Sequence, residues 1–123
     1  MTETALISIV DDDESIREAI QSLLRSVGFR TQMFASAEQF LQSDQIETTA
    51  CLILDVRMPG MSGLELQRQL KATQSRIPIV FVTAHGDAEA RSRALQEGAV
   101  EFLLKPFSEE ALLNAIQLAL PAQ

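Results

Sequence analysis

The sequence predicts an α/β protein in which five β-strands alternate with five helices. Two observations predict this class. Short apolar runs alternate along the 123-residue chain with segments whose apolar residues recur at helical spacing. Strands that alternate with helices form a parallel sheet through right-handed crossovers, with helices on both faces. We therefore expect a doubly wound, five-stranded (βα)5 sheet.

The first half of the chain contains two predicted strands and two predicted helices. Residues 5–10 form an apolar strand, which three aspartates follow. Residues 16–27 carry isoleucine, leucine and valine at helical spacing, and a glycine ends this helix. Residues 29–34 are more polar and predict a strand at the edge of the sheet. Ser36 is placed to cap a short helix, with Gln39 as its capping-box partner.

The second half continues the alternation. Residues 51–54 predict a buried strand, which is followed by the loop VRMPGMSG and a third helix. Residues 77–82 are the most apolar strand, and a polar, alanine-containing helix follows over about 87–97. Residues 99–104 predict the fifth strand. Ser108 is placed to cap the last helix, which a proline ends.

Composition narrows the functional classes. The length suits one domain. Ten basic and seventeen acidic residues give a net charge of −7, which opposes binding to nucleic acid or to anionic membranes. The single cysteine, Cys51, excludes an intramolecular disulfide, and its buried strand predicts an inert thiol. The N-terminus is not a signal peptide, and no apolar run approaches the roughly 20 residues that span a bilayer. We expect a cytoplasmic protein.

Polar residues gather where the predicted strands end. Asp11 and Asp12 follow the first strand, Asp55 the third, Thr83 the fourth and Lys105 the fifth. In a parallel sheet these ends share one edge, where ligands bind. Each residue alone has an ordinary explanation as a helix cap, a turn former or a solvated charge. Their convergence predicts a site.

The chemistry of these residue types favours a metal ion and a phosphoryl group. Crowded carboxylates repel one another and raise one another's pKa, and a divalent cation such as Mg²⁺ relieves that cost. Lys105 adds a compact positive charge, and Thr83 offers a neutral hydroxyl donor. Such a site suits the transfer of a phosphoryl group to a carboxylate nucleophile. Asp13 is then left to cap the first long helix.

The motifs VDDDES, LILDVRMPGMSG, VTAHGD and EFLLKPF occur in this order along the chain. Together they resemble the receiver domain of two-component response regulators over residues 1–123. The resemblance implies a flavodoxin-like sheet of strand order 2-1-3-4-5. The segments TAHGD and SAEQFL resemble the FixJ-type branch, whose members usually carry a C-terminal helix-turn-helix. The chain contains no such output domain, so it is either a receiver cut from a longer regulator or a stand-alone receiver.

The resemblance also implies a phosphorylation site. Asp55 would accept a phosphoryl group from a sensor histidine kinase, and small phosphodonors could replace the kinase. Asp11 and Asp12 would arrange Mg²⁺, or Mn²⁺, which Asp55 and the backbone carbonyl of Arg57 would also bind. The domain is expected to be a regulatory phosphoacceptor rather than an enzyme, promoting only its own phosphorylation and slow dephosphorylation.

Further roles follow from the same resemblance. Thr83 and Lys105 would contact the phosphoryl oxygens. Phe102 stands at the position of a switch aromatic, and its ring would move into space vacated by Thr83. The Lys105–Pro106 bond is expected to be cis. The residues expected to flank the phosphoryl group and modulate its lifetime are Arg57, Ala84 and His85.

Phosphorylation is expected to repack one face of the domain. This face consists of the fourth helix, the fifth strand and the fifth helix. Through it, the phosphorylated chain would form a homodimer and control an output. The expected output is transcription through a C-terminal DNA-binding domain that this chain lacks, with no direct nucleic-acid binding by this segment.

Three other functions are alternatives to that of a phosphoacceptor receiver. A flavodoxin-like electron carrier shares the topology, but three aspartates stand where its flavin phosphate would bind, and the chain has no Trp or Tyr. A phosphatase of the haloacid-dehalogenase type needs a second acid two residues after its nucleophile, where this chain has Arg57. A degenerate receiver that acts only as a binding module would lack a phosphorylation residue, and none is missing.

Overall fold

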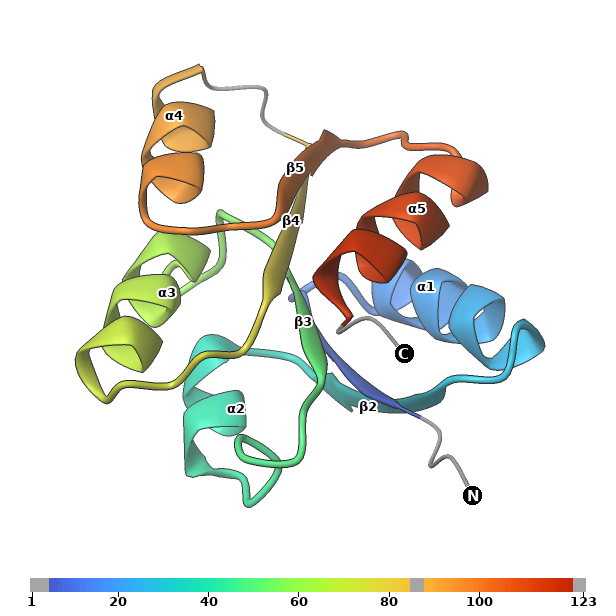
Figure 1. Cartoon of the computed structure of the whole chain (residues 1–123), viewed down its shortest axis with the longest axis horizontal. Coiled ribbons are helices and arrows are strands. Elements are labelled where there is room, and N and C mark those ends of the chain that lie inside the picture. The colour runs from blue at the N-terminus through green and yellow to red at the C-terminus, as the bar shows by residue number, and fades with distance from the viewer. Residues whose placement is uncertain (1–4, 85–87, 121–123) are drawn as a thin grey trace.

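The computed structural model describes residues 5–84 and 88–120. Within them, five parallel strands form one sheet of order β2-β1-β3-β4-β5, as predicted (Figure 1). The strands are β1 (Leu6–Val10), β2 (Arg30–Phe34), β3 (Cys51–Leu54), β4 (Ile79–Thr83) and β5 (Glu101–Leu104). The helices are α1 (Glu14–Ser26), α2 (Ala37–Gln42), α3 (Gly63–Ala72), α4 (Ala88–Gln96) and α5 (Glu109–Ala119). No helix in the described ranges has the length and hydropathy that crossing a bilayer requires.

Helices cover both faces of the sheet. Figure 1 shows α1 and α5 on one face and α2, α3 and α4 on the other. The strands β1, β3 and β4 are buried along their whole length, whereas β2 is mostly exposed, which confirms its place at the edge. Burial raises the pKa of the Cys51 thiol in β3 to about 12, in line with the inert thiol expected from the sequence.

Two apolar clusters fill the space between the sheet and its helices. The α1/α5 cluster consists of Ile7, Ile9, Ile20, Leu24, Cys51, Ile53, Val80, Val82, Leu112, Ala115, Ile116 and Ala119. The α2/α3/α4 cluster consists of Val10, Ala37, Phe40, Leu52, Leu54, Val56, Met58, Leu66, Leu70, Ile79, Phe81, Ala90, Ala94 and Phe102. Alternate residues of β3 and β4 enter opposite clusters, as the pleat of a strand requires.

One row of the second cluster lies directly beneath the carboxyl edge of the sheet. The parallel register aligns one residue from each of four strands, and all four side chains are buried: Val10, Leu54, Phe81 and Phe102. Asp11 and Asp55 follow the first two members of this row. The register of the sheet therefore sets the level of both carboxylates.

Two strands begin two residues later than the sequence predicts. β4 begins at Ile79 rather than at residue 77, because Pro78 has no N–H to donate and only its carbonyl joins the sheet, accepting from the Leu52 N–H at 2.9 Å. β5 begins at residue 101 rather than 99, because the Ala99 N–H bonds the Ala94 carbonyl at 2.9 Å and closes the end of α4. Both segments belong to the connections that lead into the strands.

Helix capping corrects one prediction and adds one motif. Ser36 caps α2 as predicted, by accepting from the Gln39 N–H at 3.1 Å. The Gln39 side chain accepts from the Ala35 N–H at 3.0 Å, so the reciprocal bond of a capping box is not made. The complete capping box is at α3, between Ser62 and Glu65. The S-x-x-E pattern at this position was the signal for it.

Candidate functional site

The strand ends meet at one edge, as the alternation of strands and helices predicts. Asp11 follows β1, Asp55 follows β3, Thr83 ends β4 and Lys105 follows β5. Sheet hydrogen bonding continues to these residues. The Asp55 N–H bonds the Val10 carbonyl at 3.0 Å, and the Lys105 N–H bonds the Thr83 carbonyl at 2.8 Å. The backbone therefore aligns the four positions, and their side chains share one small volume.

Three carboxylates of this edge form a cluster. Asp11, Asp12 and Asp55 each offer an oxygen, and these oxygens lie within 4.8 Å of one another. Asp11 and Asp55 are buried, while Asp12 is exposed, so the cluster opens to solvent on the Asp12 side. Oδ1 of Asp55 is buried without a hydrogen-bond partner in the described part of the chain. An all-oxygen donor set with one unpartnered buried oxygen fits a hard cation such as Mg²⁺.

Lys105 bridges the two buried carboxylates. Its Nζ lies 2.8 Å from Oδ2 of Asp11 and 3.6 Å from Oδ2 of Asp55. The lysine side chain is 14% exposed, so it keeps a path to solvent. Lys105 therefore neutralises part of the negative charge of the carboxylates. Its ammonium group is also close enough to form an ion pair with an anionic group attached to Asp55.

The charge on Asp55 is disfavoured in the folded protein. The pKa of Asp55 is raised, first by burial and second by the negative charge of Asp11. Lys105, the backbone of Arg57 and the Thr83 hydroxyl oppose this rise without cancelling it. A bound cation would lower the energetic cost of the charged Asp55 carboxylate, and neutralisation of that carboxylate would remove it. For Asp55, the repulsion expected from the sequence is present, although burial contributes more.

The loop after β3 holds the backbone of Asp55 against α3. The Gly63 N–H bonds the Val56 carbonyl at 2.8 Å, and a Cβ at Gly63 would clash with the Asp55 carbonyl oxygen. Only glycine permits this approach. From α2, Glu38 accepts the Met61 N–H at 2.9 Å. Neither contact was foreseen, because each joins segments whose distance depends on the whole fold.

The remaining residues predicted for the site are divided between core and surface. Phe102 is 5% exposed and packs on Phe81 with ring centroids 5.9 Å apart, so its ring already occupies the core below the site. The side chains of Arg57 and Ala84 are exposed, and His85 lies outside the described residues. The Lys105–Pro106 peptide bond is cis.

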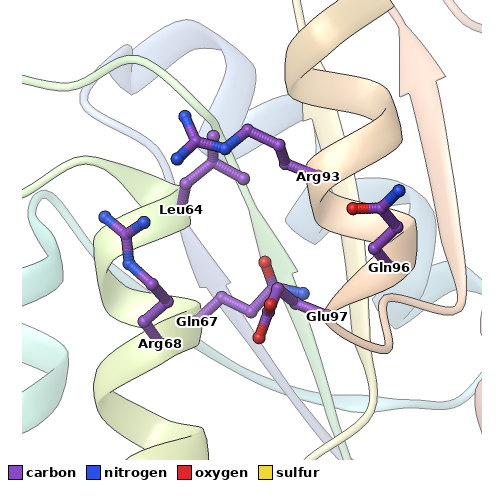
Figure 2. A pocket seen from close by; sticks show the side chains of 6 residues that line it. All are labelled: Leu64, Gln67, Arg68, Arg93, Gln96 and Glu97. Carbon is purple, nitrogen blue, oxygen red and sulfur yellow. The ribbon is translucent and has the colours of Figure 1, made fainter.

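A separate polar cleft lies between α3 and α4. Its volume is about 100 Å³, and none of its lining residues belongs to the acidic edge: Leu64, Gln67, Arg68, Arg93, Gln96 and Glu97. Figure 2 shows side chains of both helices facing each other across it. Gln67 donates from Nε2 to the Ala94 carbonyl at 3.0 Å, which links the two helices. The cleft joins two helices and takes no part in the carboxylate site.

Fold and site together define a class of protein. It is a doubly wound α/β domain with an acidic, lysine-bridged site beside the β1/β3 switch point. The family model of the response regulator receiver domain matches residues 7–117. The chain belongs to this family, and the resemblance to receiver domains that its motifs indicated is confirmed.

Two regulators illustrate the relationship. The chain is 50% identical over 116 residues to the response regulator protein TodT of Pseudomonas putida, covering 94% of this chain and 51% of TodT. It is 40% identical over 120 residues to the transcriptional regulatory protein FixJ of Bradyrhizobium diazoefficiens, covering 98% of this chain and 58% of FixJ. The chain therefore spans about half the length of these relatives.

Solved structures agree with the sheet order and the helical layers. The response regulator StyR superposes with a TM-score of 0.89 at 52% identity, over 96% of this chain and 60% of StyR. The FixJ-N structure superposes with a TM-score of 0.86 at 36% identity, over 99% of this chain and all of that one. The receiver fold predicted from the sequence is confirmed.

Proposed function

We propose that this chain is the phosphoryl-accepting switch of a two-component system and that Asp55 takes the phosphoryl group from a histidine of a sensor kinase. One observation carries the proposal. In a chain of the receiver family, a buried carboxylate with an unpartnered oxygen lies beside two further aspartates and 3.6 Å from a lysine ammonium group. Asp55 is the member of this group that follows the central strand β3.

The chemistry is a direct group transfer. A carboxylate oxygen of Asp55 attacks phosphorus, the phosphorus–nitrogen bond of the phosphohistidine breaks, and the imidazole leaves with its electron pair and takes up a proton. An acyl phosphate is the product. Lys105 already lies within 4.0 Å of both buried carboxylates, so its ammonium group can follow the new negative charge. The hydroxyl of Thr83 would donate a hydrogen bond to an oxygen of the transferred phosphoryl group.

The donor set fits a divalent cation. Asp11, Asp12 and Asp55 would hold Mg²⁺ or Mn²⁺ through carboxylate oxygens, and the backbone carbonyl of Arg57 would supply a further oxygen. Bound there, the ion would neutralise charge on the transferred phosphoryl group. The open side at Asp12 leaves room for water ligands and for the phosphodonor.

Mass spectrometry of the intact protein tests the proposal. The chain is incubated with Mg²⁺ and acetyl phosphate, and Asp55→Asn is treated in parallel. We expect one phosphoryl adduct on the wild type and none on the variant. The absence of an adduct on the folded wild type, or an adduct that persists in Asp55→Asn, would show the assignment to be wrong.

We further propose that the phosphorylated chain forms a homodimer through α4, β5 and α5. Leu104 of β5 and Leu118 of α5 are 51% and 71% exposed, so both elements offer apolar side-chain area to a partner. Phe102 joins β5 to the core below the site, so repacking of its ring would reach this surface. Sedimentation with and without beryllofluoride should show a rise in mass. An unchanged mass would rule out the dimer.

The output is proposed from the relatives. FixJ is named a transcriptional regulatory protein, and this chain covers 58% of it. We propose that the receiver controls a DNA-binding partner domain in the cytoplasm and does not itself bind nucleic acid, since its net charge of −7 opposes phosphate backbones.

A further inference from the structure

We propose that Arg17 is a positioning residue of the cation site, because it fixes the turn that carries Asp11 and Asp12. This inference rests on the proposed function of that site. Arg17 lies in the first turns of α1, and its Nη1 donates to the backbone carbonyl oxygen of Asp11 at 2.7 Å. The bond is partly buried and charge-assisted, so it is stronger than an ordinary bond between neutral groups.

The bonded carbonyl belongs to the peptide that joins the two aspartates. A peptide unit is planar and contains the Asp11 carbonyl oxygen together with the N and Cα atoms of Asp12. A bond that fixes the direction of this carbonyl oxygen therefore also fixes the orientation of the peptide plane in which the Asp12 Cα lies. Asp12 is exposed, so its carboxylate takes its position from this backbone rather than from surrounding side chains. Arg17 therefore controls how the Asp12 oxygen lies relative to those of Asp11 and Asp55.

The other restraints on the turn act on different atoms. The Asp13 N–H bonds Oδ1 of Asp11 at 2.9 Å, and the Ile16 N–H bonds Oδ1 of Asp13 at 3.2 Å. These bonds orient the Asp11 side chain and start the helix. They leave the carbonyl of the Asp11–Asp12 peptide to Arg17, so each restraint has a separate role.

The charge of Arg17 acts in the opposite direction to its positioning role. A guanidinium group near three carboxylates repels an incoming cation, so charge alone predicts tighter Mg²⁺ binding when Arg17 is removed. Interactions between charges at an open surface are weak, because water and salt screen them. Mg²⁺ requires near-ideal octahedral geometry, and loss of a residue that orients a ligand lowers metal affinity by about 10-fold or more. We therefore expect the positioning role to dominate.

The test compares three variants of the whole chain. Arg17→Ala removes the bond and the charge, and Arg17→Lys keeps a donor and the charge. Arg25→Ala removes the same charge from the last turn of the same helix, away from the aspartates. Mg²⁺ affinity is measured by titrating the backbone amide shifts of residues 11–13, without a phosphodonor. The Mg²⁺ concentration that half-saturates phosphorylation by acetyl phosphate is measured separately.

We expect Arg17→Ala to raise both Mg²⁺ constants by about 10-fold or more, Arg17→Lys to restore part of the loss and Arg25→Ala to change them by less than about 2-fold. Urea unfolding in Mg²⁺-free buffer establishes that each variant is folded. The inference is wrong if folded Arg17→Ala binds Mg²⁺ as tightly as the wild type, or more tightly. A wild type that binds no Mg²⁺ would instead overturn the proposed function, and the inference with it.

Discussion

Helices α1 and α5 on one face of the sheet are packed differently from α4 on the other face. On one face, α1 and α5 insert large aliphatic side chains into the core, namely Ile20, Leu24, Leu112 and Ile116. On the other face, α4 buries only Ala90 and Ala94. The hydrophobic free energy of packing is proportional to the apolar area removed from water. It therefore stabilises α4 much less than α1. The difference indicates where the domain can rearrange at low cost.

Polar contacts hold α4 where apolar contacts are few. Gln67 reaches from α3 to the Ala94 carbonyl, and the Lys71 ammonium group lies 3.0 Å from Oε1 of Glu97. Oε1 of Gln67 is nevertheless buried without a partner in the described part of the chain. A buried polar atom without a partner costs about 1–3 kcal/mol. The hydrogen bonding between α3 and α4 is therefore incomplete. This favours a shift of α4 when the charge of the Asp11, Asp12 and Asp55 cluster changes.

The largest effect should come from truncating one leucine of α1 to alanine, in comparison with one leucine of α4. Leu24→Ala in α1 removes a fully buried side chain and should lower the free energy of unfolding by about 2–5 kcal/mol. Leu95→Ala in α4 removes a half-buried side chain and should cost no more than about 1 kcal/mol. Urea denaturation measures both. Equal losses would contradict the difference between α1 and α4.

The second prediction concerns Asp55, which follows β3 at the carboxyl edge of the sheet. Its pKa is raised, so the folded state disfavours the charged carboxylate. The resulting loss of stability is absent below the ordinary aspartate pKa of about 4. It develops as the pH rises from there through the pKa of Asp55 in the folded protein. In Mg²⁺-free buffer, Asp55→Asn should therefore be more stable than the wild type at pH 7. The gain should shrink as the pH falls to about 4.

Urea denaturation across this pH range measures the Asp55→Asn effect. Glu65→Gln is a useful comparison, because hydrogen bonds to the backbone and side chain of Ser62 lower the pKa of the exposed Glu65, the opposite direction. That variant should be less stable than the wild type at pH 7 and should approach it in acid. A constant gain for Asp55→Asn at all pH values would contradict the role of charge.

The smallest effect should come from the exposed ion pair between α3 and α4. Lys71→Ala should lower the free energy of unfolding by about 0.2–1 kcal/mol, because both side chains are solvated and the pair is screened. The loss should disappear in 1 M salt. If it persists there, or exceeds the Leu95→Ala loss, α4 depends on this pair more than the comparison of α1 with α4 allows.

Much of the site could be predicted because its residues follow strands. Asp11, Asp55, Thr83 and Lys105 each end an apolar run, and parallel strands bring such ends together whatever the details of packing. The distribution of charge within the site could not be predicted. Lys105 lies nearer to Asp11 than to Asp55, a difference set by the packing of β5 beside β4 and by the turn after β1.

The sequence by itself determined the alternation of strands and helices, the edge position of β2 and the residue types at the carboxyl edge. Periodicity and identity are local properties, so they can be read from one chain. Only the tertiary structure decided that Gly63 lies against the Asp55 carbonyl, that Glu38 holds the Met61 N–H and that Arg17 holds the Asp11 carbonyl. The first two contacts join separate elements, and the third depends on how α1 leaves the sheet. Their distances depend on packing that no local pattern encodes.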